Sequence, residues 1–245
     1  MRVVIITQAR MTSTRLPGKV LRKVHWKSLL EHQLDRLKRV ASIGEVIVAT
    51  TVNQSDEPIV ELCKKLQVAY HRGSENDVLA RYYGAAEPFK PDVVVRVTSD
   101  CPLIDPGVIE QVIQFYIDHY PTYDYVSNCL TRSYPRGMDT EVFSFQALEE
   151  AFNEATALPD REHVTPFIQN QPDRYRLGDV SYHQNQNSHR WTVDTEEDFD
   201  LISKIIDTLY PEKANFNLED ILKILEQNPE WKKINTHVEQ KKYGE

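Results

Sequence analysis

The sequence is poor in cysteine, and the three cysteines that it has, Cys63, Cys101 and Cys129, are widely spaced. An odd number of cysteines without a Cys-x-x-Cys pair predicts neither a disulfide framework nor a structural zinc site. No apolar run reaches the ~18–20 residues that cross a bilayer. The short apolar stretch near Met1 does not suit a signal peptide. We therefore expect a cytoplasmic protein that is not associated with a membrane.

The common glycine-rich nucleotide motifs are also missing. The sequence contains neither GxGxxG nor GxxxxGK[ST], which excludes the usual dinucleotide fingerprint and the Walker A loop. Glycine itself is scarce, with eight in 245 residues. Three of them, Gly18, Gly73 and Gly137, fall in segments that we expect to form a site, where the backbone must turn sharply or approach a ligand closely.

Negative charge is absent from the amino terminus, where no Asp or Glu precedes Glu31. The formal net charge of −8 argues against a general nucleic-acid-binding protein. The first thirty residues nevertheless contain Arg2, Arg10, Arg15, Lys19, Arg22, Lys23 and Lys27. This local excess of positive charge in an acidic protein predicts an anion-binding site, and a solvated face that is basic by chance is the alternative.

Hydrophobic periodicity predicts alternating strands and helices in the first half of the chain. β-branched apolar runs such as VVVRVT are typical of strands that are buried on both faces. Strands are expected at 3–7, 45–51, 68–71, 93–98 and 123–128, and helices at 29–40, 58–66, 78–87 and 106–119. The alternation predicts an α/β fold with a mostly parallel, Rossmann-like sheet covered by helices.

The second half has a less regular pattern. Residues 130–190 are expected to form an inserted lobe, and 191–193 to return to the sheet. Within and after the lobe we expect strands at 141–143 and 175–181 and helices at 145–154, 166–169, 196–209 and 218–227. A polar tail follows Pro229 and is expected to be partly disordered. Because no repeat or low-complexity linker divides residues 1–245, we expect a single domain.

The basic residues gather in the loop after the first predicted strand. The segment Gln8-Ala9-Arg10-Met11-Thr12-Ser13-Thr14-Arg15-Leu16-Pro17-Gly18-Lys19 combines hydroxyl side chains, three cations and a Pro-Gly turn. Guanidinium groups bind phosphate oxygens two at a time, and backbone N–H groups of a tight loop can face the same anion. Ligands bind beyond the carboxyl ends of parallel strands, so the loops after residues 7, 71 and 98 are expected to share one rim.

Two aspartates at predicted strand ends are candidate metal ligands. A bound triphosphate needs a divalent cation, which proteins hold with one or two carboxylates plus phosphate oxygens and water. Asp100 lies two residues beyond the strand at 93–98, and Asp194 ends the apolar segment that starts at Arg190. A turn or helix cap is the alternative role for each, although Asp105 already precedes the proline that opens the helix after Asp100.

The segment from Ala9 to Lys19 resembles the signature of the sugar-acid cytidylyltransferases, the CMP-sialate and CMP-Kdo synthetases, and above all their branch linked to spore coat polysaccharide. Asp100 before Pro102-Leu103, and Asp194 before a Thr-x-x-Asp helix start, are similar to the metal-binding aspartates of this family. The resemblance implies a three-layer α/β/α fold, CTP as donor, Mg²⁺ as cofactor, a small sugar as acceptor and a homodimer.

The resemblance also implies roles for individual residues. Arg10, Lys19 and Asp100 are expected to be catalytic, and Asp100 and Asp194 to hold Mg²⁺. Residues expected to contact the nucleotide are Gln8, Ala9, Arg10, Ser13, Arg15, Lys19, Arg72, Gly73, Ser74 and Thr98. Thr98 stands where the CMP-Kdo and CMP-sialate synthetases have glutamine, so the preference for CTP is left more open than nucleotidyl transfer itself.

The acceptor sugar is expected to bind in the lobe at 130–190, which is also a candidate dimerisation region. The candidate contacts are Arg136, Asp139, Glu141, Arg161 and His163. His163 is either a base for the sugar hydroxyl, since imidazole titrates near neutral pH, or a residue held by Glu162 or by a dimer contact. Arg161 is a candidate partner of a sugar carboxylate, as are Arg132, Arg136 and Arg190.

These features predict an Mg²⁺-dependent nucleotidyltransferase that transfers CMP from CTP to a sugar or sugar acid and releases pyrophosphate, in surface polysaccharide biosynthesis. One alternative is a glycosyltransferase that uses a nucleotide-sugar, a class that needs an Asp-x-Asp motif at a strand end. The only such motif here is Asp198-Phe199-Asp200, which lies in a predicted helix. A binding protein with the same fold and no chemistry is the other alternative.

Overall fold

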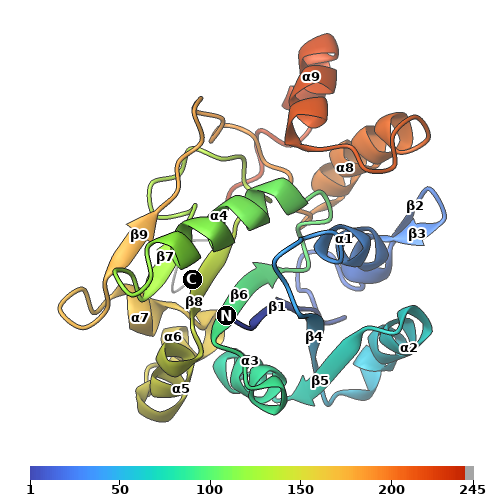
Figure 1. Ribbon diagram of the computed structural model, residues 1–245. Coiled ribbons are helices and arrows are strands. Elements are labelled where there is room, and N and C mark those ends of the chain that lie inside the picture. The colour runs from blue at the N-terminus through green and yellow to red at the C-terminus, as the bar shows by residue number, and fades with distance from the viewer. Residues whose placement is uncertain (241–245) are drawn as a thin grey trace.

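The computed structural model describes residues 1–240, and its centre is a seven-stranded sheet with the order β5-β4-β1-β6-β8-β7-β9 (Figure 1). The strands are β1 (Val3–Gln8), β4 (Glu45–Thr51), β5 (Ala69–Gly73), β6 (Val93–Thr98), β7 (Tyr125–Ser127), β8 (Glu141–Ser144) and β9 (Leu177–Asp179). β5, β4, β1 and β6 are parallel neighbours, and β9 is parallel to β7. Only β8 runs antiparallel to its neighbours β6 and β7.

Helices cover both faces of the sheet. The helices are α1 (Leu29–Leu37), α2 (Glu57–Leu66), α3 (Val78–Ala86), α4 (Pro106–Asp118), α5 (Phe145–Glu154), α6 (Leu158–His163), α7 (Pro166–Gln169), α8 (Glu196–Leu209) and α9 (Leu218–Gln227). A short hairpin of β2 (Lys23–Val24) and β3 (Lys27–Ser28) precedes α1. The predicted α/β fold with a mostly parallel sheet between helical layers is confirmed.

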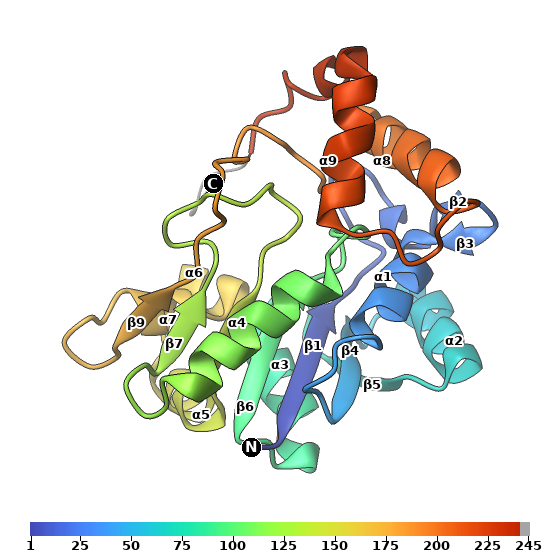
Figure 2. The same cartoon turned by 45° about the horizontal axis from the view of Figure 1, so that its top comes forward.

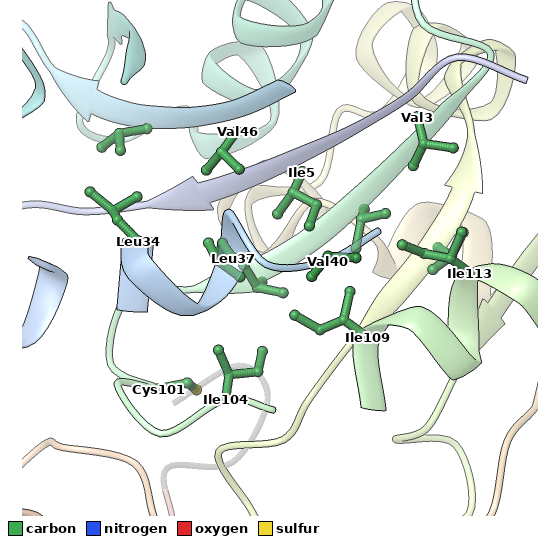
Figure 3. Packing of buried hydrophobic residues seen from close by; sticks show 14 of the residues in the cluster. Val3, Ile5, Leu34, Leu37, Val40, Val46, Cys101, Ile104, Ile109 and Ile113 are labelled. Carbon is green, nitrogen blue, oxygen red and sulfur yellow. The ribbon is translucent and has the colours of Figure 1, made fainter. Parts of the chain in front are cut away.

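The alternation of side chains along β1 explains the two helical layers. Val3 and Ile5 pack with Leu37 of α1 and with Ile109 of α4 on one face of the sheet (Figure 3). Val4 and Ile6 belong to a second cluster on the other face, with Leu79 and Tyr82 of α3 and Leu148 of α5. A strand that is apolar at every position must be covered on both sides, because successive side chains point to opposite faces.

A third apolar cluster lies beyond one end of the sheet, where α8 and α9 pack together (Figure 2). Its members include Trp191 and Val193, together with Ile205 of α8 and Ile221 of α9. The prediction that 191–193 returns to the sheet is therefore wrong. The backbone of residues 191–193 instead forms hydrogen bonds with loops: Trp191 N donates to Arg136 O (2.8 Å), and Val193 N donates to Asp100 O (2.8 Å). The apolar pattern reflected burial in this cluster and not strand pairing.

Other boundaries differ in ways that affect the site. β5 continues to Gly73, because Thr50 and Thr51 of β4 pair with Arg72 and Gly73. Residues 130–190 supply β8 and β9 to the central sheet in addition to the loops around them. The sequence did not predict α6, which has no side-chain cap at its amino end. No helix within residues 1–240 is both long enough and apolar enough to span a membrane.

The segment after α9 is ordered as far as the structure describes it. Pro229–Lys233 forms a 3-10 helix, and Asn235 behind it is buried. The expectation of a partly disordered tail is therefore not met at residues 229–235, and residues 241–245 lie outside the described residues. This segment returns to the end of the sheet where the predicted site residues lie.

Candidate active site

The loop after β1 is held in one shape by hydrogen bonds at both ends. Gly18 N donates to Met11 O (2.9 Å), and Gly18 has a φ of 69°, in the left-handed region that glycine adopts without strain. Met11 N donates to the buried carboxylate of Asp56 (2.8 Å), which is also bound by Thr50 and Thr51 of β4. The loop therefore folds back, and Lys19 begins a 3-10 helix at the sheet edge.

Lys19 joins the two aspartates predicted as metal ligands. Its Nζ lies 2.8 Å from Oδ1 of Asp194 and 3.9 Å from Oδ2 of Asp100, and it donates to the carbonyl of Val193 at 2.6 Å. Arg15 approaches the other oxygen of Asp194 at 2.8 Å. The structure thus brings together cations from the first loop, an aspartate that follows β6 and an aspartate that precedes α8.

The electrostatic balance at Asp194 favours a charged carboxylate. Burial of Asp194 disfavours its ionised form and raises its pKa. Lys19, then Arg15 and Arg190, more than offset this effect and hold the pKa of the carboxyl below its ordinary value of 3.8. At neutral pH the group is therefore an anion that is shared among three cations. Thr195 caps α8, and so Asp194 is free of the capping role that was its alternative.

Asp100 is oriented by the residue that departs from the family pattern. The hydroxyl of Thr98, at the end of β6, donates to Oδ1 of Asp100 at 2.5 Å. Capping of α4 is carried out by Asp105, whose Oδ1 accepts from Gly107 N at 2.7 Å. With its other oxygen near Lys19, Asp100 faces the same space as Asp194.

Arg10 lies on the other side of the loop and pairs with Glu75 at 3.4 Å. Glu75 also accepts hydrogen bonds from the hydroxyl of Thr12 and from the amide of Asn53 (2.5 Å). The bond from Thr12 is the main cause of a lowered pKa at Glu75, with smaller contributions from Asn53 and Arg10. Glu75 was not singled out from the sequence, although its position two residues after Gly73 on the same rim was the available signal.

Three further residues predicted to bind the nucleotide lie on or near this rim, and they differ in how many hydrogen bonds they form within the protein. Gln8 has a buried Oε1 that accepts no hydrogen bond from residues 1–240, and Ala9 is tied by its N–H to Ala49 O of β4 (3.1 Å). Ser13 Oγ accepts from Leu16 N (3.4 Å) and helps to shape the loop. Direct contact of these residues with a nucleotide stays a prediction.

Arg72 is already engaged within the protein. Its guanidinium pairs with Glu57 (2.7 Å) and donates to the carbonyls of Thr51 and Asn53, each at 3.0 Å. A side chain at Gly73 would approach Cγ of Arg81 to 2.7 Å, so the glycine is needed for packing. Ser74 Oγ accepts from Asp77 N (3.3 Å). This geometry favours a structural role for the three, and their nucleotide role stays a prediction.

Three of the predicted acceptor residues have ion-pair partners. Asp139 receives two bonds from Arg132, at 2.6 and 2.7 Å. Glu141 pairs with Arg96 of β6 and accepts from the hydroxyl of Tyr125 at 3.0 Å. Arg161 of α6 binds both oxygens of Asp77, which caps α3. It also donates to the carbonyl of Phe152 at the end of α5 (2.7 Å), so the geometry favours a role in tying three helices together.

His163 ends α6 within the electrostatic reach of Arg96 and Glu141. Burial lowers its pKa below 6.5, Arg96 lowers it further, and the nearby carboxylates act in the opposite sense. A neutral imidazole at pH 7 is the form that a general base requires. The role of His163 stays a prediction with the same alternatives as before.

Arg136 differs from its neighbours because it forms no ion pair with any residue in 1–240, whereas Arg132 and Arg190 both do. It lines a cavity of about 300 Å³, together with His189, Trp191, Lys232, Asn235 and residues near them. Gly137, with a φ of 104°, allows the chain to approach Trp191 closely, since a side chain there would lie 2.8 Å from Trp191 O. The backbone of Arg136 pairs with that of Arg190, and its guanidinium has no direct ion pair within residues 1–240.

Two carboxylates, Asp100 and Asp194, suit Mg²⁺, which takes its other ligands from phosphate and water, better than a metal whose ligands all come from the protein. Within residues 1–240, no three His, Cys, Asp or Glu side chains are grouped so that they could hold a metal ion. Mg²⁺ is commonly bound by one or two carboxylates and completed by phosphate oxygens and water. Both aspartates already reach one cationic group, the ammonium of Lys19, so both can face one cation.

The Asp-x-Asp motif is not available as a metal site. Asp198 is fully buried in the first turn of α8, where it binds Arg190 and the backbone N–H of Asp194 (2.9 Å). The predicted helical setting of Asp198-Phe199-Asp200 is confirmed. This removes the feature on which the glycosyltransferase alternative depended.

Comparison with known proteins agrees with this geometry. A family model described as cytidylyltransferase matches residues 4–237. The spore coat polysaccharide biosynthesis protein SpsF of Bacillus subtilis is 32% identical over 93% of this chain and 95% of its own length. An uncharacterized protein of Methanocaldococcus jannaschii, MJ1063, is 38% identical over 100% of this chain and 99% of its own.

Solved structures show the same relationship. A cytidylyltransferase from Leptospira borgpetersenii superposes with a TM-score of 0.90 at 32% identity, covering 94% of this chain and 96% of that one. A CMP-2-keto-3-deoxy-manno-octonic acid synthetase complexed with CTP has a TM-score of 0.65 at 16% identity, covering 84% of this chain and 99% of that one. The second likeness is one of fold alone.

Proposed function

Starting from the fact that this chain belongs to the cytidylyltransferase family, we propose that it transfers CMP from CTP to a sugar or sugar acid, with Mg²⁺ as cofactor and pyrophosphate as the leaving group. The observation that carries the proposal is the contact of Lys19 with both Asp100 and Asp194. These groups combine the positive charge that a triphosphate requires with the oxygen ligands that Mg²⁺ prefers.

The triphosphate binds by replacing ion pairs within the protein. Arg15 and Lys19 are paired with Asp194, and Arg10 with Glu75. When phosphate oxygens take over Arg15 and Lys19, Asp194 loses two of its three cationic partners, and its Oδ1 becomes available to a cation. Mg²⁺ held by Asp100 and Asp194 would neutralise phosphate charge and make the α-phosphorus easier to attack. CTP and Mg²⁺ are therefore expected to bind together more tightly than either binds alone.

In the reaction, the acceptor oxygen attacks the α-phosphorus in line, its hydroxyl proton passes to water or to a base for which His163 is the candidate, and the bond to pyrophosphate breaks. Charge develops on the leaving pyrophosphate, and the cations of the loop, Lys19 and Arg10, are placed to stabilise it. Arg136 is the proposed partner for an acidic group on the acceptor, because it forms no ion pair within residues 1–240 and lines a cavity.

The wider context is proposed from two observations. The relationship to SpsF supports a role in surface polysaccharide biosynthesis. The three cysteines, all free, are consistent with a reducing cytoplasm. The homodimer implied by the family resemblance stays a prediction.

The test is a thermal-shift series with CTP, UTP, GTP and ATP, each with and without Mg²⁺. A ligand that binds only the folded state raises the melting temperature in a concentration-dependent way. We expect the largest shift from CTP with Mg²⁺, a smaller one from CTP alone, and pyrophosphate release only when an acceptor such as Kdo or N-acetylneuraminate is added. A larger shift with another nucleotide would contradict the assignment of CTP, and no shift with any nucleotide would contradict the proposed function.

A further inference from the structure

Arg190 lies between two aspartates that differ in their access to the site. Its Nη2 is 2.7 Å from Oδ2 of Asp194, while Nε and Nη2 reach the two oxygens of Asp198 at 3.0 and 3.1 Å. Burial alone lowers the pKa of Arg190, but Asp198 and then Asp194 raise it above its ordinary value. Arg190 is thus a permanent cation that pairs with two carboxylates, Asp194 in the site and Asp198 behind it.

Asp198 is the centre of this arrangement. The side chain is fully buried, and its oxygens accept the backbone N–H groups of Asp194 (2.9 Å) and Thr195 (3.3 Å) as well as Arg190. A helix cap alone would need only the bonds to the backbone around Thr195. The additional contacts with Arg190 connect the first turn of α8 to the carboxylate that faces Lys19.

Asn235 closes the arrangement from the end of the described chain. Its Nδ2 donates to Oδ1 of Asp198 (2.8 Å) and to the carbonyl oxygen of Arg190 (2.9 Å), and the residue is buried. A single amide group therefore fixes both the side chain of Asp198 and the backbone of Arg190. The segment that carries Asn235 follows the 3-10 helix at Pro229–Lys233, far in sequence from the loop after β1.

We propose that Asp198 and Asn235 are positioning residues for Asp194, acting through Arg190. They hold Arg190 on Oδ2 of Asp194, so that Oδ1 is directed toward Lys19 and the space shared with Asp100. Because Arg190 also pairs with Asp198, its electrostatic attraction to Asp194 is weaker than it would be in an exclusive ion pair. Nη1 of Arg190 donates to Gln240 (2.5 Å), and Asp198 is the only other carboxylate among residues 1–240 that binds this guanidinium. Without Asp198, Arg190 would interact more strongly with Asp194 and compete with any other cation there. This inference rests on the proposed function, because it assigns the purpose of the arrangement to a cation at Asp194.

The test measures cation binding without turnover. Mn²⁺ serves as the probe, followed by electron paramagnetic resonance in the presence of CTP and the absence of acceptor, in wild type, Asp198→Asn and Asn235→Ala. Loss of a group that orients a metal ligand commonly costs about 10–100-fold in metal affinity. We expect Mn²⁺ binding to weaken by at least about tenfold in Asp198→Asn and by several-fold in Asn235→Ala.

Two variants of α9 are matched controls. Asp220 occupies the same position in the capping box of α9 as Asp198 does in α8, and the half-buried side-chain amide of Asn228 donates to Ile224 O (2.9 Å). Asp220→Asn and Asn228→Ala should lower the melting temperature and leave Mn²⁺ binding unchanged. A purely structural role for Asp198 and Asn235 would give this same pattern.

The outcomes separate the two proposals. Wild type that binds no Mn²⁺ with CTP would contradict the proposed function and, with it, this inference. Wild-type binding together with unchanged affinity in Asn235→Ala and Asp198→Asn would overturn the inference alone. If Asp198→Asn does not fold, as judged by circular dichroism, Asn235→Ala decides: a loss of affinity supports the positioning role and a wild-type affinity contradicts it.

Discussion

Arginine and lysine are used differently in the loop after β1 and in the region of residues 130–190. In the loop, Arg15 and Lys19 share one carboxylate, Asp194, which is bound by a third cation as well. In the second region, Arg132 and Arg161 each have a carboxylate partner with two bonds. Shared pairs can be exchanged for ligand at little cost, whereas a two-bond pair must be broken first. The difference indicates which cations are available to substrate.

The largest effect on activity is expected when the ion-pair group of Lys19, Asp100 and Asp194 is disrupted. Lys19→Ala and Asp100→Ala should each lower kcat/KM by about 10²–10³-fold or more. The first removes a positive charge where the transition state becomes more negative, and the second removes a carboxylate proposed to hold Mg²⁺. Pyrophosphate release measures the rate, and circular dichroism should show an intact fold. Lys27→Ala is the control, since Lys27 pairs with Asp35 away from the site. A near-normal rate in either variant would show that its assigned role is wrong.

A smaller and more selective effect is expected at Arg136, the cation of the second region that has no ion pair among the described residues. Arg136→Ala should raise KM for an acidic acceptor by about tenfold, the value of one charged hydrogen bond, with KM for CTP unchanged. Steady-state kinetics with Kdo or N-acetylneuraminate measures both constants.

Arg161→Ala is the matched control for Arg136, because its guanidinium binds Asp77 and the carbonyl of Phe152. We expect it to lower the free energy of unfolding by about 1–2 kcal/mol in urea and to leave acceptor KM unchanged. The reverse pattern, with a raised KM in Arg161→Ala alone, would move the acceptor contact to Arg161 and end the distinction between free and paired arginines.

The smallest effect concerns His189, which lines the cavity beside Arg136. Burial, and then the charge of Lys232, lower the pKa of His189 from 6.5 to about 4. The unfolded chain binds a proton at His189 below pH 6.5 while the folded protein resists it, so this contribution to stability is present above pH 6.5. It is lost as the pH falls toward 4.

His189→Gln should therefore lose less stability than wild type between pH 6.5 and pH 4, by on the order of 1 kcal/mol. Urea unfolding at several pH values gives the difference. Parallel curves for the two proteins would show that His189 titrates normally and that the cavity does not disfavour positive charge.

The parts of the molecule that could be predicted are those in which burial and local chemistry act over a few residues. Uninterrupted apolar runs located β1, β4 and β6, because a strand in the middle of a parallel sheet has no solvent face. Asp100 and the cations before Lys19 followed from their place just after two such strands. Asp194 was found although the segment before it is not a strand, because the apolar residues at 191–193 are buried all the same.

Other features could not be predicted, because they depend on which distant groups meet. The sequence offers Arg161 as a ligand for a sugar carboxylate, whereas the structure pairs it with Asp77, which lies 84 residues away in sequence. Nothing local to Asn235 indicates that its amide bonds to Asp198 and to the backbone of Arg190. A charged or amide side chain looks the same in sequence whether its partner is substrate or protein.

The amino-acid sequence by itself determined the layered α/β fold, the position of the basic loop after β1 and the two aspartates that accompany it, since periodicity and residue type are local properties. Tertiary structure alone decided that Lys19 meets Asp194 across 175 residues, that Arg136 has no ion pair within residues 1–240, and that Asn235 reaches the back of the site. These depend on the packing of the third apolar cluster, which brings the carboxyl-terminal segments over the ends of β1 and β6 and is not encoded in any short stretch of the chain.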